Sequence, residues 1–138
     1  MKRHPGWEYS LQAAFAQARE HTFAWGQFDC ALFACDCVAV MTGEDPAAEI
    51  RGHYSNEQQA IELIGGDLGT FAATIAAKCG MPEVRASFAG RGDVVLVDNG
   101  EPGRALGVVD HGGRFAWCAA PRGLRRVGID RWLRAWKV

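Results

Sequence analysis

The sequence predicts an α+β protein in which N-terminal helices pack on a C-terminal antiparallel β-meander. Up to about residue 80, apolar residues recur at helical spacing, and capping residues or glycines bound each stretch. From about residue 92 the pattern changes to short runs rich in valine and aromatic residues, separated by turn residues. A chain of 138 residues with 49% hydrophobic residues can bury one core. We therefore expect a single domain over 1–138, with helices at about 7–80 and a sheet at about 92–138.

Helix boundaries follow from capping residues and glycine stops. Leu11 and Phe15 share one face of the first helix. Ser55 and Gln58 have the spacing of a capping box at the start of the third. Asp36, within the second, is either a buried partner of an arginine or a residue of the solvent face, and we favour the solvent face. The expected helices are Glu8–Glu20, Cys30–Met41, a third from Ser55 to Gly65-Gly66 and a fourth from Asp67 to Gly80.

Turn residues divide the C-terminal part into short strands. Glycine, proline and asparagine cluster at 99–103, 111–113 and 121–123, as is typical of hairpin turns. Consecutive strands joined by such turns form an antiparallel meander. Asp130 is expected to start a short helical turn before Trp136. The expected strands are Gly92–Asp98, Ala105–Asp110, Arg114–Ala120 and Leu124–Ile129.

The charge of the chain limits the classes of partner. A net charge of −1 argues against a protein built to neutralise a phosphate backbone, so we expect no nucleic-acid partner. The charge is uneven, because Arg122–Val138 carries six basic residues and one acid, Asp130, for a net charge of +5. This segment is either a binding face or a solvated edge with arginines outside and aromatic residues inside.

Neither a targeting signal nor a membrane span is expected. The stretch Met1–Trp7 has basic residues but lacks the apolar region of a secretory signal peptide. No run approaches the roughly 18 apolar residues that a membrane span requires. If the protein leaves a cell, we expect it to leave by lysis or inside a particle.

The cysteines are expected to be free thiols. Cys30, Cys35 and Cys37 lie close together in sequence, and Cys79 and Cys118 lie far away. A chain of this size needs no disulfides, and unpaired thiols suit a reducing cytosol. Cys30 and Cys37 would be about 10 Å apart along a helix, which is too far to share one metal ion. We therefore expect no metal and no cofactor.

The segment with the most chemical content is Trp25–Asp29 together with Cys30. Cys30 would open an apolar helix, where unpaired N–H groups and the helix dipole favour a thiolate. Asp29 is expected at the N-cap, where its carboxylate satisfies an N–H group but repels a thiolate. Cys30 is therefore a candidate nucleophile, with Trp25 and Asp29 as candidate binding residues beside it. The alternative is a buried cysteine that only packs.

The order of these motifs resembles the NlpC family of papain-fold cysteine peptidases and amidases. In that family an Asp-Cys pair opens the nucleophile helix, followed by a Gly-Asp strand, a strand of the type His-Val-Gly-Ile, and a strand that begins with a basic-aromatic pair. This resemblance covers roughly 25–120 and implies a papain-like fold with Cys30 at the nucleophile position. The matching segments are Asp29-Cys30, Gly92–Val95, Ala105–Val109 and Gly113–Phe115.

Two catalytic positions depart from this family. Ala105 stands where the resemblance places the catalytic histidine, and the polar residue that orients this histidine would fall near Trp117. An indole cannot act there as a carboxylate or an amide does. His111 lies six residues beyond Ala105, about 20 Å along an extended strand. The remaining histidines, expected at surface or loop positions, are His4, His21 and His53.

The chain also resembles a subgroup encoded in the tail-assembly gene clusters of tailed phages and prophages. This resemblance implies assembly in the host cytoplasm, location in the virion, and tail-tip or baseplate proteins as partners. It also implies peptidoglycan as a further partner. The motifs that carry it, besides those already given, are Trp25-Gly26, Asp45-Pro46, Arg51–Ser55, Gly65-Gly66 and Ala135–Val138.

Three functions follow from these observations. The first is a phage tail-tip or tail-assembly component whose peptidase machinery is degenerate and which has a structural or binding role. The second is an active cysteine amidase or peptidase that cleaves peptidoglycan peptides as the phage genome enters the cell, with a base from another histidine or a partner chain. The third is an intracellular regulator whose thiol senses oxidants. The missing histidine favours the first over the second.

Overall fold

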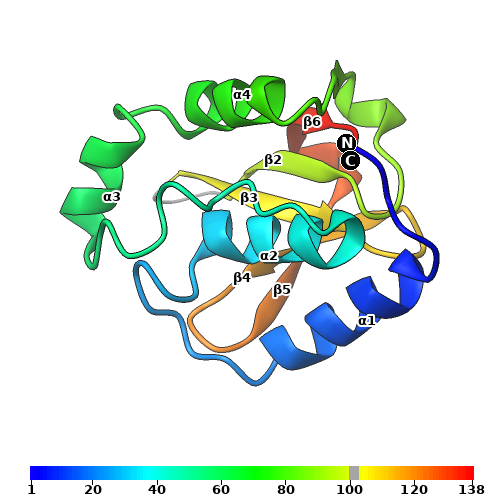
Figure 1. Ribbon diagram of the computed structural model, residues 1–138, viewed down its shortest axis with the longest axis horizontal. Helices are drawn as coiled ribbons and strands as arrows, with labels where there is room; N and C mark the ends of the chain where they lie inside the picture. Colours follow the sequence, from blue (N-terminus) through cyan, green and yellow to red (C-terminus); the bar gives the residue numbers. More distant parts are fainter. Residues whose placement is uncertain (100–102) are drawn as a thin grey trace.

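The computed structural model describes residues 1–99 and 103–138. Within these residues the chain forms four helices and an antiparallel sheet of six strands, which confirms the α+β class (Figure 1). All predicted helices and meander strands are present, with small shifts at their ends. The helices are α1 (Trp7–Ala18), α2 (Cys30–Thr42), α3 (Glu57–Leu63) and α4 (Leu68–Lys78), with 3₁₀ turns at Ala86–Phe88 and Ile129–Arg131. The strands are β1 (Glu83–Val84), β2 (Val94–Asp98), β3 (Arg104–Val109), β4 (Phe115–Ala119), β5 (Leu124–Gly128) and β6 (Trp132–Trp136).

The strand order in the sheet is β1-β6-β2-β3-β4-β5, so the predicted meander β2–β5 makes up most of the sheet. The helical turn predicted at Asp130 is present, but the sequence prediction missed β6, which lies between β1 and β2. The register of β6 shifts opposite Leu96 and Val97, where Leu133 forms a bulge. Because the bulge adds a residue, β6 lacks the strict alternation of apolar and polar residues that marks a strand.

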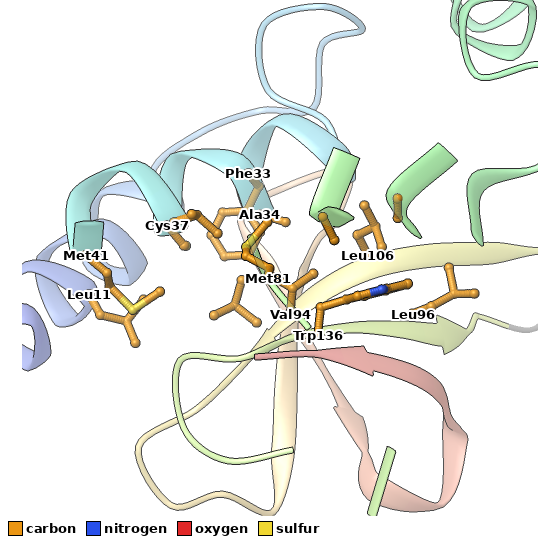
Figure 2. Packing of buried hydrophobic residues seen from close by; sticks show 14 of the residues in the cluster. Leu11, Phe33, Ala34, Cys37, Met41, Met81, Val94, Leu96, Leu106 and Trp136 are labelled. Carbon is orange, nitrogen blue, oxygen red and sulfur yellow. The ribbon is translucent and has the colours of Figure 1, made fainter. Parts of the chain in front are cut away.

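The helices cover one face of the sheet. On this face Val94 and Leu106 of the strands meet Phe33 and Cys37 of α2 in the main core (Figure 2). The opposite face carries a second cluster of buried residues, and the thiol of Cys30, at the start of α2, packs against this second cluster. Its members are Val95, Val97, Ala105, Val109, Ala116, Cys118, Val127, Trp132 and Ala135.

Side-chain caps fix the starts of three helices. Asp29 caps α2 by accepting from the Leu32 N–H, as the sequence predicts, and Asp67 caps α4. The prediction for α3 was one residue out. Asn56, and not Ser55, accepts from the Gln59 N–H, while the Gln59 amide oxygen accepts from the Ser55 N–H. The reciprocal capping interaction is therefore present, shifted by one residue.

A buried carboxylate ties the two ends of the described chain to the sheet. Asp93 is fully buried and accepts from Arg3 at 2.8 Å and from the Val138 N–H at 3.1 Å. The ammonium group of Lys137 lies 3.1 Å from its other oxygen. The two ends consequently lie side by side (Figure 1).

Two further expectations from the sequence concern membrane spans and the turn at 99–103. In the described residues no single helix is long and apolar enough to cross a membrane, and only α3 with α4, across a bend of 56°, has the required length and composition. The predicted turn at 99–103 falls on residues 100–102, which lie outside the described part of the chain. The adjoining Asn99 N–H donates to the Gly103 carbonyl.

Candidate functional site

A cavity of about 400 Å³ lies where the start of α2 faces α3, the start of α4 and the first residues of β3. Figure 1 shows α3 beyond the first turn of α2, apart from the sheet. All three residues that the sequence singles out, Trp25, Asp29 and Cys30, line this cavity. The other lining residues are Phe23, Ala31, Ile50, Tyr54, Glu57, Ala60, Ile61, Leu63, Ile64, Leu68, Phe71, Asn99, Gly103, Arg104, Ala105 and Ala119.

Asp29 organises the wall of the cavity around Cys30. Its carboxylate is buried and accepts from the Leu32 N–H at 2.9 Å, the Gly26 N–H at 3.0 Å and the Tyr54 hydroxyl at 2.5 Å. Burial, and then the bond to Asp29, raise the pKa of Tyr54, so its hydroxyl remains a donor at neutral pH. One side chain therefore joins the loop before α2, the first turn of α2 and the loop before α3.

Gly26 allows this arrangement. Its φ of +79° lies in the left-handed region, and a Cβ atom there would lie 2.0 Å from the Tyr54 carbonyl oxygen. Any larger residue would push the loop away from Tyr54. The Trp25-Gly26 motif thus has a packing reason that is independent of chemistry at Cys30.

The Cys30 thiol is held in its neutral form. Burial, with a contribution from the negative charge of Asp29, raises its pKa to about 11. Hydrogen bonds from the backbone N–H groups of Leu106 and Ala31 act in the opposite direction but are outweighed. Leu106 has a free N–H because β3 pairs with β4 only at Val108 and Val109. The expectation that the helix start favours a thiolate is therefore wrong for this site, because desolvation exceeds the helix-terminal effect.

Among the described residues, no histidine lines the cavity beside Cys30. Ala105 lines it, as the resemblance to the NlpC family implies for the histidine position, and Ala119 of β4 lines it as well. Trp117, expected near the third catalytic position, does not line it. The Trp117 indole N–H instead donates to Asp110 at 2.8 Å. Of these two β4 residues, Ala119 and not Trp117 therefore faces the cavity.

The histidines, all four of which belong to the described residues, lie elsewhere. The His4 ring bonds to the Val40 carbonyl, ten residues along α2 from Cys30 and so about 15 Å away. The His21 ring stacks on Phe28, and the His111 ring bonds to the Glu8 carbonyl. His53 is exposed. None of them lines the Cys30 cavity, in agreement with the surface or loop positions expected for them.

The polar groups on the cavity wall opposite Asp29 were not found from the sequence. Glu57, Arg104 and Asn99 all line the cavity, and the side-chain oxygen of Asn99 is buried without a hydrogen-bond partner among the described residues. They come from α3, β3 and the end of β2, so only the tertiary fold brings them to one wall. Asn99, within a predicted turn, carried no signal of a role in a site.

The loop between α2 and α3 is fastened to α2 by an ion-pair network outside the cavity. Arg51 bonds to Asp45 at 2.7 Å and to Asp36 at 2.5 Å. The carboxylate of Asp36 is 46% exposed, so it is both an arginine partner and partly solvated. Each alternative for Asp36 is therefore confirmed in part: it lies at the solvent face, as we preferred, and it pairs with Arg51, which returns to this face of α2 from fifteen residues away.

The cysteines all lie in the described part of the chain and all are free. Within that part, no group of three His, Cys, Asp or Glu residues could hold a metal ion. Burial, with a contribution from the nearby Cys30, raises the pKa of the Cys118 thiol to about 12.

Comparison with protein families gives a match over nearly the whole chain. A family model described as a domain of unknown function, DUF6950, matches residues 2–138. No curated protein matches the chain. The matched range includes both the Cys30 cavity and the whole sheet. Because the match spans nearly the full sequence, the chain belongs to the DUF6950 family.

Proposed function

We propose that the chain is a phage tail-tip or tail-assembly component built on a papain-like, NlpC-type scaffold that has lost its peptidase chemistry. In this proposal the cavity at Cys30 serves a structural or binding role in the virion. The partners are other tail-tip or baseplate proteins, with peptidoglycan as a second binding partner. The protein assembles in the host cytoplasm.

The observation that carries the proposal is the composition of the Cys30 cavity. Cys30 and Ala105 line the same cavity, which is the relation that an NlpC nucleophile and histidine would have. With alanine in that place, none of the four described histidines lines the cavity to accept the thiol proton and return it to a leaving amine. The thiol, with a pKa of about 11, also remains protonated at neutral pH.

The order of the elements supports the scaffold assignment. The nucleophile position opens α2, the Gly92-Asp93 motif leads into β2, and Ala105 lies in β3, beside β2 in the sheet. The basic-aromatic pair Arg114-Phe115 leads into β4, the next strand. The virion location rests on sequence resemblance alone.

An active amidase remains the second candidate, because one feature favours it. The N–H groups of Leu106 and Ala31 are directed at the Cys30 sulfur, and such donors can stabilise the oxyanion of an acyl-transfer reaction. This function requires a histidine donated by a partner chain into the cavity. Cys30 would then attack the carbonyl of a peptidoglycan peptide.

Hydrolysis of purified peptidoglycan separates the two candidates. The wild-type chain and Cys30→Ala should release free amines at the same background rate, both alone and within isolated phage tails. If the wild-type chain releases amines above background and Cys30→Ala does not, Cys30 is a working nucleophile. That result would overturn the proposal that the peptidase chemistry has been lost. Recovery of the chain with purified tails, measured by mass spectrometry, tests the virion location, and its absence from tails would refute that part.

A further inference from the structure

Strand β5 forms one edge of the sheet in the described part of the chain, and its exposed side chains are cationic. Arg125 and Arg126 lie in the middle of the strand and are exposed. Arg122 precedes the strand and Arg131 follows it, both exposed. None of the four lines the Cys30 cavity. Arg125 reaches the carbonyl of Asn99, a residue of the cavity wall, at 3.4 Å, so the edge adjoins the candidate site without lining it.

The backbone of β5 has unused hydrogen-bonding groups on its outer side. The Ala120 N–H donates to the Gly123 carbonyl and the Ile129 N–H donates to the Arg114 carbonyl, at the two ends of the β4–β5 ladder. Hydrogen-bonded pairs alternate in an antiparallel ladder, so residues 125 and 127 bond to β4. The N–H and C=O groups of Leu124 and Arg126 consequently point away from the sheet, with no partner among the described residues, whereas the Gly128 carbonyl begins the 3₁₀ turn Ile129–Arg131.

The chain itself shows that this side accepts an extended antiparallel segment. Just before β5, the Gly123 N–H donates to the His21 carbonyl and the Phe23 N–H donates to the Pro121 carbonyl. This pairing stops where α1 ends, because a helix cannot continue the ladder. Beyond this point the remaining length of β5 is unpaired on its outer side.

The charge along the edge is not neutralised by the described residues. Arg122, Arg125, Arg126 and Arg131 take part in no ion pair there, whereas Arg134 and Lys137 of the same basic segment are paired with Glu83 and Asp93. Asp130 is the sole acid between Arg122 and Arg131. Such an edge opposes pairing with a second copy of itself, since like charges would meet across the new ladder.

We propose that the β5 edge docks an extended, acidic segment of a partner protein as an added antiparallel strand. The partner's backbone pairs with Leu124 and Arg126, and its carboxylates meet arginines that lie on both faces of the sheet. Arg125 is on the face of Cys118, its cross-strand neighbour, and Arg126 is on the face of Trp117. The backbone gives affinity and the charge selects the partner.

A nucleic acid is the competing anionic partner, and the structure favours a strand over it. Phosphates would pair with the arginines but would leave the row of outward N–H and C=O groups unused. The test therefore includes an oligonucleotide.

The experiment measures binding of a fluorescent seven-residue peptide, alternating valine and glutamate, to the full chain by anisotropy. Three matched ligands accompany it: the same peptide with lysine for glutamate, the acidic peptide N-methylated at alternate residues, and a single-stranded oligothymidylate of equal charge. The variants are Arg125→Ala/Arg126→Ala and, as a control, Arg85→Ala, which removes an exposed arginine from the opposite end of the sheet. Circular dichroism verifies that each variant is folded.

We expect the acidic peptide to bind and the lysine peptide not to bind. N-methylation and the double arginine variant should each weaken binding by about tenfold or more, Arg85→Ala should leave it unchanged, and raising salt from about 50 to about 300 mM should weaken it. Equal binding of the N-methylated peptide or of the oligothymidylate would overturn strand docking, because charge alone would then suffice. Absence of binding by the acidic peptide would overturn the proposal outright.

Discussion

Replacing Asp29 by alanine tests whether this residue holds the Cys30 cavity together. The substitution removes the acceptor for the Leu32 N–H, which is a helix cap of about 1 kcal/mol. It also removes the acceptor for the Gly26 N–H and the Tyr54 hydroxyl, and bonds to a charged group contribute about 1.5–3 kcal/mol each. Part of this is recovered as water reaches the loop, so we expect a loss of about 3–5 kcal/mol in the free energy of unfolding.

Urea denaturation followed by circular dichroism measures this loss. Asp67→Ala is the matched control, because Asp67 also caps a helix but binds only within its own first turn. The Asp67→Ala substitution should lower the free energy of unfolding by about 1 kcal/mol. In a Tyr54→Phe background the effect of Asp29→Ala should shrink, because the two residues share a bond. A loss for Asp29→Ala no larger than that for Asp67→Ala would show that Asp29 is a cap and nothing more.

Three further predictions concern the site and the sheet. The raised pKa of Cys30 keeps its thiol protonated, so at pH 8 iodoacetamide should alkylate Cys30 about a hundredfold more slowly than a thiol of pKa 9.0. The alkylation rate should rise with pH up to about pH 11. A rate that becomes constant below pH 9 would contradict the raised pKa. Gly26→Ala should lower the free energy of unfolding by roughly 3 kcal/mol or more. Gly43→Ala is the control, because Gly43 has a φ of +81° but open space around it, and it should lower the free energy of unfolding by about 1 kcal/mol. If the two variants unfold at the same urea concentration, the proposed clash with Tyr54 is refuted. Asp93→Ala should lower the free energy of unfolding by about 3–5 kcal/mol, because it leaves the Arg3 guanidinium without its buried partner. Lys137→Ala, at the exposed end of the same cluster, should lower it by under about 1 kcal/mol. Similar losses for the two variants would mean that the burial of Asp93 does not contribute to stability.

The parts of the fold that were predictable are those whose signals are local. Glycine stops, the Asp29 cap and turn residues gave α2 and the strands β2–β5 close to their observed ends. The strand β6 was missed because its bulge at Leu133 breaks the alternation, and β1 because two residues carry no period. The one-residue error at Ser55 arose because Asn56 is an equally good cap.

For the site, the sequence located one wall and missed the other. Trp25, Asp29 and Cys30 are neighbours in the chain, and resemblance placed Ala105 opposite them. Tyr54 was noted only as part of a motif, yet its hydroxyl fixes Asp29, because a contact across twenty-five residues leaves no periodic trace. The sequence analysis also predicted the wrong direction for the shift in the Cys30 pKa, because desolvation depends on how the surrounding residues pack around the thiol.

The place of β6 in the sheet has a consequence for how the chain folds during synthesis. Among the described elements, β6 leaves the ribosome after the others, yet it lies between β1 and β2, which leave much earlier. Until it arrives, β2 has an open edge and the core lacks Trp136. The meander β2–β5 can form first from near neighbours, whereas closure of the sheet requires contacts distant in sequence, which form slowly. A nascent chain arrested before Trp132 should therefore be the aggregation-prone state of this protein.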